Sequence, residues 1–282
     1  MTRSQSALLR AHGIRPVKRR GQNFLLDANI AQAIAAEILA LGRDVLELGA
    51  GAGALTGPLL AGQAAVTAIE VDRKLCAVLR QEYGAQPGLR LVEADLARLD
   101  WAATLAAAGP RPVVAGNLPY LLTSVVLFAL AAQRERVAGA ILMMQREVAD
   151  RLCAAPGGRS YGVLAALLGA VFTPRMVRTV PPTVFWPRPE VASAVVRLIP
   201  VAENWPEPAW QQYEATVKAL FGQRRKKVGT LLRSRFGLTA AQAVEAAERA
   251  GIDPGARPET LPVARLRALA AGLPEPRVGG GS

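Results

Sequence analysis

Short apolar segments alternate with helical patterns along much of the chain, and this alternation limits the possible folds more than any other feature. The segments predicted as strands span residues 44–48, 65–70, 89–94, 112–115 and 138–143. Strands separated by amphipathic helices are typical of βαβ units, which build a parallel sheet with helices on both faces. The sequence therefore predicts an α/β fold with a Rossmann-like sheet.

The region after the fifth strand has a different pattern. Residues 176–180 and 194–199 are predicted strands on either side of the proline-rich segment 181–189, which indicates an antiparallel hairpin at the sheet edge. Beyond residue 200, Pro and Gly interrupt short helical segments, as in a small all-α domain. We predict a basic N-terminal arm at 1–20, an α/β domain at 21–200, a helical domain at 201–273 and a flexible tail at 274–282.

Basic residues outnumber acidic ones, 34 to 22, and give a formal net charge of +12. A chain this basic is expected to bind a polyanion, most often nucleic acid. The basic residues are clustered, which favours contacts with phosphates over an evenly solvated surface. Those predicted to contact nucleic acid are Arg19, Arg20, Arg146 and the run Arg224-Arg225-Lys226-Lys227, which we expect on a helix.

The residue inventory excludes several kinds of chemistry. His12 is the only histidine, and Cys76 and Cys153 are the only cysteines. A histidine-based triad is therefore excluded, and a metal site is not expected. The separated cysteines favour a reducing compartment. Charged residues interrupt every apolar stretch, so we expect a soluble, cytoplasmic protein without a membrane partner.

A glycine-rich loop follows the first predicted strand. Residues 45–48 lead into Gly49-Ala50-Gly51-Ala52-Gly53. Glycine lets the backbone turn sharply and approach a ligand closely, and the next helix directs its N-terminal amides toward the same space. Dinucleotide-binding folds and methyltransferase folds share this pattern, so the loop alone does not separate them.

Polar side chains at the strand ends separate these two classes. Glu47 precedes the loop, Glu70 ends the second strand, and Asp95 and Asn117 follow the third and fourth. Glu70 is placed for ribose hydroxyls and Asp95 for an adenine amino group. Glu47 is poorly placed for a pyrophosphate. S-adenosylmethionine carries an ammonium and a sulfonium but no phosphate, so the acidic lining favours it as the cofactor.

The tetrapeptide Asn117-Leu118-Pro119-Tyr120 predicts the chemistry. Amino-directed methyltransferases present an [Asn/Asp]-x-Pro-[aromatic] loop after the fourth strand, as this chain does. The exocyclic amine of adenine is a poor nucleophile because its lone pair is delocalised into the ring. The Asn117 side-chain oxygen and the Leu118 carbonyl can accept its N–H groups and expose that lone pair. Pro119 stiffens the loop, and Tyr120 offers a stacking face for an extruded base.

Aromatic residues make up only 5 % of the chain, so those expected near this loop are informative. Phe24 and Phe185 are both predicted to lie near the mouth of the site. Phe185 is a candidate for the second face of a base clamp, with core packing an equal alternative. For Trp186, core packing is favoured.

Together these motifs resemble the bacterial small-subunit ribosomal RNA adenine N6,N6-dimethyltransferase family, from about Lys18 to beyond Arg235. The resemblance rests on motifs in a fixed order, at residues 21–25, 47–51, 117–120, 145–149, 159–162, 181–189, 193–197 and 221–227. It implies a class I methyltransferase sheet with a small helical C-terminal domain that contacts the ribosomal particle. It also implies dimethylation of two adjacent adenosines in the hairpin near the 3′ end of the small-subunit RNA, late in subunit assembly.

The resemblance also assigns roles to residues. It implies cofactor contacts at Asn23, Leu25, Gly49, Glu70, Asp95 and Asn117, to which the pocket analysis adds Glu47 and Gly51. It implies base handling by Asn117, Leu118, Tyr120 and Phe185, with Pro119 in the same loop. The expected partners are the small ribosomal subunit and its RNA, and we expect a monomer. Two departures from the family pattern stand out. Ala50 replaces a usual proline, and Leu121-Leu122-Thr123-Ser124 follow Tyr120 where the family has a polar Asn-Ile-Ser/Thr start, which bears on the hydrogen bonding behind Tyr120.

Three other functions remain as alternatives. The first is the same chemistry on large-subunit RNA, as in antibiotic-resistance methylases; the motif at residues 221–227 and the long C-terminal segment favour the small-subunit type. The second is a non-catalytic assembly factor, against which the intact 117–120 segment argues. The third is an NAD-dependent oxidoreductase, disfavoured by Asp95 and Asn117.

Overall fold

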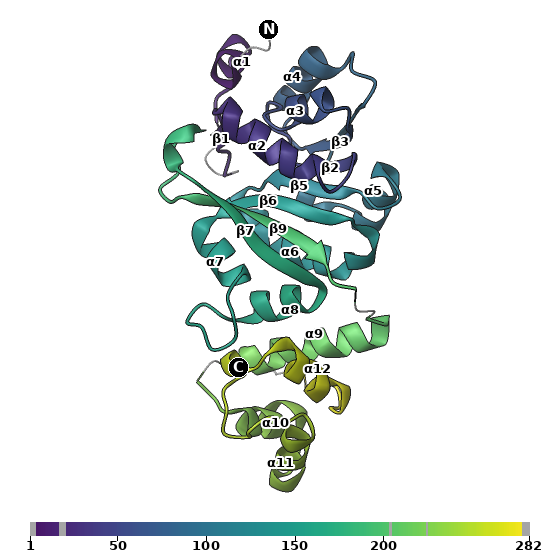
Figure 1. The fold of residues 1–282 in the computed structure, drawn as a ribbon, viewed down its shortest axis with the longest axis vertical. Helices are drawn as coiled ribbons and strands as arrows, with labels where there is room; N and C mark the ends of the chain where they lie inside the picture. The colour runs from purple at the N-terminus through teal and green to yellow at the C-terminus, as the bar shows by residue number, and fades with distance from the viewer. Residues whose placement is uncertain (1–3, 17–20, 203–204, 224, 278–282) are drawn as a thin grey trace. The chain divides into compact units, whose positions relative to one another are not determined.

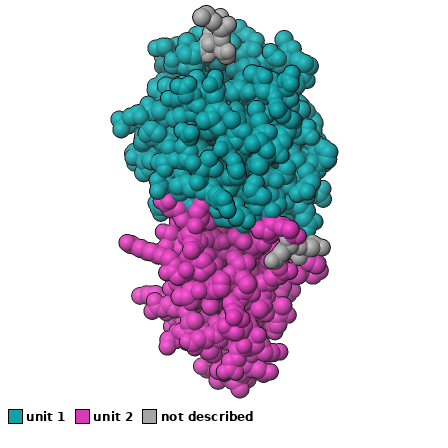
Figure 2. All heavy atoms as spheres, viewed as in Figure 1, with its two compact units in different colours: residues 1–149, 172–200 teal, residues 150–171, 201–282 magenta. Residues whose placement is uncertain are grey.

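The computed structural model of the chain describes residues 4–16, 21–202, 205–223 and 225–277. The chain divides into two compact units, coloured separately in Figure 2. Unit 1 comprises residues 1–149 and 172–200, and unit 2 comprises residues 150–171 and 201–282. Within the described ranges, no helix combines the length and the apolar character needed to cross a bilayer.

Unit 1 is built on a mixed sheet (Figure 1). The neighbouring strands are, in spatial order, β4 (Leu89–Glu93), β3 (Ala65–Glu70), β2 (Asp44–Leu48), β5 (Val113–Asn117), β6 (Gly139–Gln145), β9 (Ser193–Pro200) and β7 (Phe172–Val180). The strands from β4 to β6 are parallel, and β9 runs antiparallel between β6 and β7. The predicted strands and the predicted edge hairpin are confirmed.

The central strands are apolar because both faces of the sheet are covered. Val45, Leu46 and Leu48 of β2 and the β5 run from Val113 to Ala115 are fully buried. The covering helices are α2 (Ala28–Leu39), α3 (Thr56–Ala61), α4 (Arg73–Tyr83), α5 (Trp101–Ala108) and α6 (Thr123–Ala132). Helix α7 (Arg146–Leu152) follows β6, and the division between the two units falls within it. Right-handed crossovers place α3 and α4 on one face and α5 and α6 on the other, since the chain progresses across the sheet in opposite directions.

Aspartates begin three of these helices. Asp27, Asp72 and Asp100 each accept a backbone N–H of the following helix, at α2, α4 and α5 respectively. Such caps satisfy amides that have no partner inside a helix. The Asp72 cap holds the start of α4 next to the end of β3.

Two N-terminal elements pack onto unit 1. Helix α1 (Gln5–Ala11) buries Leu8 and Leu9 in a cluster with Phe24 and Leu75. Strand β1 (Phe24–Leu25) pairs antiparallel with β8 (Phe185–Trp186), so the start of the chain meets the proline-rich segment. The described part of the predicted N-terminal arm, residues 4–16, thus contains a folded helix.

Unit 2 is helical and contains α8 (Val163–Val171), α9 (Glu207–Phe221), α10 (Val228–Phe236), α11 (Ala240–Arg249) and α12 (Val263–Ala271). Tyr213 Oη donates to the Ala166 carbonyl at 2.9 Å, and Trp205 Nε1 donates to the Ala170 carbonyl at 3.0 Å. These bonds attach α8 to the C-terminal helices. Residues 150–171 therefore pack within unit 2, although the predicted α/β range, 21–200, included them.

Short 3-10 turns complete the described structure, at Leu96–Arg98 (η2), Tyr120–Leu122 (η3), Arg134–Arg136 (η4), Pro182–Val184 (η5) and Pro258–Thr260 (η6). Part of the predicted tail is held by hydrogen bonds. Gln212 Nε2 donates to the Pro274 carbonyl at 3.1 Å, and the Arg277 amide donates to the Arg235 carbonyl at 2.7 Å. Residues 278–282 lie outside the described residues.

Candidate functional site

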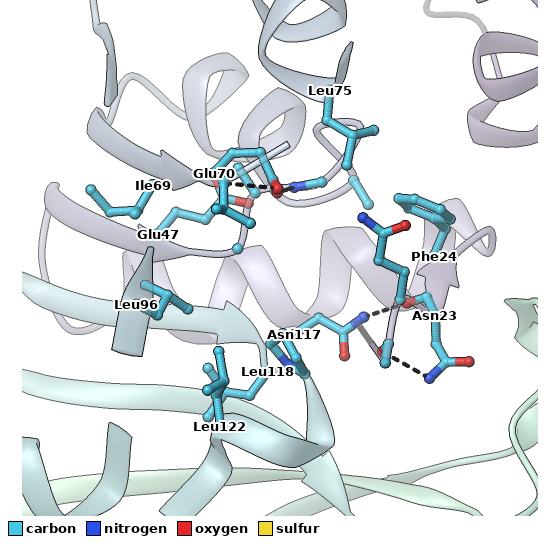
Figure 3. A pocket seen from close by; sticks show the side chains of 18 of the residues that line it. Asn23, Phe24, Glu47, Ile69, Glu70, Leu75, Leu96, Asn117, Leu118 and Leu122 are labelled. Carbon is cyan, nitrogen blue, oxygen red and sulfur yellow. Dashed lines mark hydrogen bonds between the residues drawn. The ribbon is translucent and has the colours of Figure 1, made fainter. Parts of the chain in front are cut away.

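A pocket of about 390 Å³ opens at the carboxyl ends of the parallel strands of unit 1 (Figure 3). Open α/β sheets bind ligands at this edge, beside the point where the strand order reverses. Here that point lies between β2 and β5. The lining includes the residues predicted to bind the cofactor, namely Asn23, Leu25, Glu47, Gly49, Gly51, Glu70, Asp95 and Asn117, and also Leu118, Pro119 and Tyr120.

The glycine loop forms one wall and requires glycine for two reasons. Gly49, Gly51 and Gly53 have φ values of +68°, +60° and +86°, which strain residues with a side chain. A Cβ on Gly53 would also lie 2.4 Å from Cε2 of Tyr83, whose hydroxyl donates to the Gly53 carbonyl at 3.4 Å. Tyr83 of α4 therefore packs directly against this turn of the loop.

Glu70 organises the loop through its carboxylate. One oxygen accepts the Gly51 amide at 2.8 Å, and the other accepts the amides of Val71 and Asp72 at 2.9 Å (Figure 3 shows Glu70 facing the loop). Burial raises the pKa of Glu70, and the three backbone donors oppose that rise. The side chain thus joins the end of β3 to the loop after β2.

Glu47 lies deeper in the same wall. It is 2 % exposed, and its Oε2 accepts the Thr56 hydroxyl at 2.7 Å. Burial raises the pKa of Glu47 to about 8, and the neighbouring charge of Glu70 adds to the effect. A cationic ligand group beside Glu47 would favour the ionised carboxylate and reverse this shift.

Asp95 follows β4 and is exposed at the rim of the pocket. Its Oδ1 accepts the Ala97 amide at 2.9 Å and caps the turn η2. Among the described residues, no group of three or more His, Cys, Asp or Glu side chains is arranged to hold a metal ion.

The opposite wall begins with Asn117, at the end of β5. Its side-chain Nδ2 donates to the Asn23 carbonyl at 2.9 Å (Figure 3). Because a carbonyl can only accept, the amide nitrogen must face Asn23, and the side-chain oxygen remains for another partner. Asn23 in turn donates to the Gly21 carbonyl at 3.3 Å. The N-terminal segment 21–25 therefore sets the orientation of the Asn117 amide.

Leu118 and Tyr120 are fixed by contacts with other strands. Leu118 is 2 % exposed, and its amide donates to the Met143 carbonyl of β6 at 3.0 Å. The Tyr120 hydroxyl lies 3.1 Å from Oγ of Ser193, the first residue of β9. No sequence prediction gave Ser193 or Thr56 a role, because only the folded sheet brings them to the site.

The two aromatic residues of β8 differ from each other in exposure. Phe185 is 4 % exposed, belongs to the apolar core and is not part of the pocket lining. Trp186 is 40 % exposed, so the core packing favoured for it was wrong. Its ring stacks with Phe24 of the pocket, with centroids 6.3 Å apart. The two side chains point to opposite sides because they are neighbours on one strand.

The predicted nucleic-acid contacts fall in both units. Arg146 is exposed at the start of α7 and donates to the Thr179 hydroxyl at 2.8 Å. Arg225, Lys226 and Lys227 are exposed in the turn before α10, so the helix predicted for this run was wrong. The turn arises where α9 ends at Gly222, and Lys227 is the N-cap residue of α10. Arg19, Arg20 and Arg224 lie outside the described residues.

The strand order, the antiparallel β9 and the polar pocket beside Asn117-Leu118-Pro119-Tyr120 define a Rossmann-like methyltransferase. A family model described as ribosomal RNA adenine dimethylase matches residues 15–270. The chain belongs to this family.

Individual relatives agree with this membership. A ribosomal RNA small subunit methyltransferase A from Anaeromyxobacter sp. (strain K) is 45 % identical, covering 94 % of this chain and 96 % of the relative. The protein of the same name from Moorella thermoacetica is 41 % identical, covering 90 % and 91 %. Among solved structures, the 23S rRNA methyltransferase ErmE superposes with a TM-score of 0.68 at 25 % identity, covering 88 % of this chain and 98 % of that one. A dimethyladenosine transferase from Plasmodium falciparum shares the fold, with a TM-score of 0.72 at 21 % identity, covering 86 % and 94 %.

Proposed function

We propose that this chain transfers methyl groups from S-adenosylmethionine to N6 of two adjacent adenosines in the 3′-terminal hairpin of small-subunit ribosomal RNA. The product is N6,N6-dimethyladenosine, formed late in subunit assembly. The observation that carries the proposal is the Asn117 amide, which is oriented by the Asn23 carbonyl in the same pocket as Glu47 and Glu70. Relatives named for the small subunit, at 45 % and 41 % identity, support the choice of RNA.

The residues present fit S-adenosylmethionine. Glu70 stands at the end of β3, where its carboxylate can accept ribose hydroxyls while it holds the loop. Burial raises the pKa of Glu47 because it disfavours the charged carboxylate. The ammonium group of the ligand would supply a compensating positive charge beside it. Asp95 at the rim can accept from the adenine amino group of the cofactor. When bound, S-adenosylmethionine supplies an electrophilic methyl group on a positively charged sulfur.

The 117–120 segment handles the target base. The Asn117 side-chain oxygen and the Leu118 carbonyl accept the two N–H groups of the adenine amine, which turns its lone pair out of conjugation. Tyr120 stacks on the extruded ring. Rate acceleration then comes from positioning the amine in line with the methyl group. As the methylated amine forms it becomes acidic, so no tuned general base is required.

The position of His12 agrees with a mechanism that uses no imidazole. Its Nε2 lies 3.3 Å from Glu82 Oε1, in a contact between the segment after α1 and helix α4. His12 is absent from the pocket lining. We therefore assign it a structural contact and no part in transfer.

The basic turn before α10 supports RNA binding by unit 2. Arg225, Lys226 and Lys227 precede a helix N-terminus, where the helix dipole disfavours positive charge. Their placement does not stabilise α10, which favours a role toward phosphates. We propose that unit 2 contacts the ribosomal particle, that Arg146 adds a phosphate contact from unit 1, and that the protein acts as a cytoplasmic monomer.

The test is methyl transfer from labelled S-adenosylmethionine to unmethylated small subunits, large subunits and free RNA, followed by nucleoside analysis. Dimethyladenosine in small subunits alone is the expected result. Label in large subunits would favour the chemistry of the 23S rRNA methyltransferase ErmE, whose fold this chain shares. Cofactor binding without any transfer would make the chain an assembly factor.

A further inference from the structure

We propose that Ser193 is a positioning residue for Tyr120, and that it holds the tyrosine ring in the orientation that stacks on the target adenine. The inference rests on the proposed function. The Ser193 hydroxyl lies 3.1 Å from the Tyr120 hydroxyl, and the two residues are 73 positions apart in the sequence. Either hydroxyl can donate, since both carry a proton and lone pairs.

The Ser193 end of this bond is rigid. The residue is 1 % exposed and pairs with Gln145 of β6 on one side and Val180 of β7 on the other. The carbonyl of the preceding residue, Ala192, accepts the Arg146 amide at 2.9 Å. A hydroxyl on a strand held from both sides is a fixed point, unlike one carried by a loop.

The Tyr120 end needs such a fixed point. Tyr120 begins the short turn η3, and the next residue, Leu121, is 73 % exposed and packs little. Inside the turn, the Leu122 amide donates to the Pro119 carbonyl at 2.9 Å. This bond holds the backbone under the ring, and Ser193 holds the tip, so the ring is fixed at both ends.

Ser193 also bears on the departure from the family pattern at Leu121. The family resemblance predicts an Asn-Ile-Ser/Thr start after Tyr120, and Leu121 in place of the asparagine raises the question of what hydrogen-bonds behind Tyr120. The hydrogen-bond partner is the hydroxyl of Ser193 in β9, which lies outside the loop. The loop can therefore be apolar and still present an ordered tyrosine.

A double-mutant cycle tests this coupling. Ser193→Ala and Tyr120→Phe each remove one hydroxyl while Tyr120→Phe keeps the stacking ring. Each should lower kcat about three- to tenfold, the range for a single net hydrogen bond, with the cofactor Kd unchanged within about twofold. The double variant should be no slower than either single one. Thr67→Val, which removes a buried hydroxyl from β3 away from the pocket lining, is the matched control and should leave kcat unchanged.

A spectroscopic measurement separates this inference from the proposed function. The chain has 4 tyrosines, so 3-fluorotyrosine labelling gives few fluorine resonances, and Tyr120→Phe assigns one of them. Ser193→Ala should shift or broaden the Tyr120 resonance and leave the others in place, whether or not the protein transfers methyl groups. If the wild-type protein transfers no methyl groups but Ser193→Ala still shifts the Tyr120 resonance, the proposed function is wrong and the positioning role of Ser193 stands. An unchanged Tyr120 resonance, or strictly multiplicative losses in the cycle, would overturn the positioning role.

Discussion

The two walls of the pocket are built in different ways. The cofactor wall consists of the glycine loop, Glu47 and Glu70, and its bonds join consecutive elements of the βαβ unit, since Glu70 reaches back only to Gly51. The base wall consists of Asn117, Leu118 and Tyr120, and distant segments hold it through the Asn23 carbonyl and Ser193. The cofactor wall is held by elements that follow one another in the sequence. The base wall is held by segments that are distant in the sequence and meet in the folded unit 1.

This difference suggests a division of labour between the walls. The cofactor wall is shaped by backbone amides on a carboxylate, and such a wall sets the affinity for a ligand. The base wall carries the acceptors and the stacking ring, and it sets the rate once ligands are bound. Variants in each wall should therefore affect different measured constants.

The largest effect is expected from Asn117→Ala. It removes an acceptor for the adenine amine and should nearly abolish methyl transfer. The cofactor Kd should stay within roughly tenfold, about 1.4 kcal/mol. Asn117→Asp is an informative control: it keeps an acceptor but sets an oxygen against the Asn23 carbonyl, 2.9 Å away in the wild type, so an intermediate rate is expected. Single-turnover transfer and calorimetry measure the two constants, and an equal loss in both would contradict the assignment.

Glu70→Ala should weaken cofactor binding and leave the rate of methyl transfer largely intact. The change removes the acceptor of three backbone amides and frees the loop at Gly51. We expect the cofactor Kd to rise about 100-fold, roughly 2.7 kcal/mol, with most of the rate recovered at saturating cofactor. An unchanged Kd, measured by calorimetry, would show that the loop needs no carboxylate.

A pair of glycine variants tests how tightly the cofactor wall is packed. Gly53→Ala adds a Cβ at φ +86° that would meet Tyr83 at 2.4 Å, whereas Gly13→Ala adds one at φ +60° with nothing within 4 Å. Denaturant unfolding should show a loss of about 1 kcal/mol for Gly13→Ala, from backbone strain alone, and about 3 kcal/mol for Gly53→Ala. Equal losses of unfolding free energy in the two variants would mean that the Tyr83 ring moves away from the new Cβ at no energetic cost.

Glu47→Gln should change the pH dependence of stability. The pKa of Glu47 is raised from 4.5 to about 8 in the folded protein. Between these values the folded carboxyl stays protonated while the unfolded one ionises, so stability falls as pH rises through this window. The fall is at most about 1.4 kcal/mol per pH unit. Melting temperatures from pH 4.5 to 8 should show a shallower fall for Glu47→Gln, and parallel curves would argue against the raised pKa.

The same contrast between the walls governs what the sequence could predict. The strands, the glycine loop and the residues at the strand ends follow from periodicity and order along the chain, so Glu47, Gly51, Glu70 and Asn117 were found to line one pocket as predicted. Their functional roles stay proposals. The local motif was sufficient because each βαβ unit returns the chain to the same sheet edge.

Contacts between distant segments could not be predicted in this way. The pairing of β1 with β8 decides that Phe185 is buried and Trp186 exposed, and a shift of one residue in its register would reverse them. The bond between Ser193 and Tyr120 likewise depends on β9 lying between β6 and β7. The turn that replaces a helix at Arg225–Lys227 follows from the end of α9 at Gly222, which charge patterning does not reveal.

The central claim is that the two walls act on separate constants. The most direct test measures the S-adenosylmethionine Kd and the rate of methyl transfer at saturating cofactor on the same preparations of Glu70→Ala and Asn117→Ala. The account predicts that Glu70→Ala mainly loses affinity for S-adenosylmethionine and that Asn117→Ala mainly loses the rate of methyl transfer. Parallel losses of both constants in both variants would contradict it.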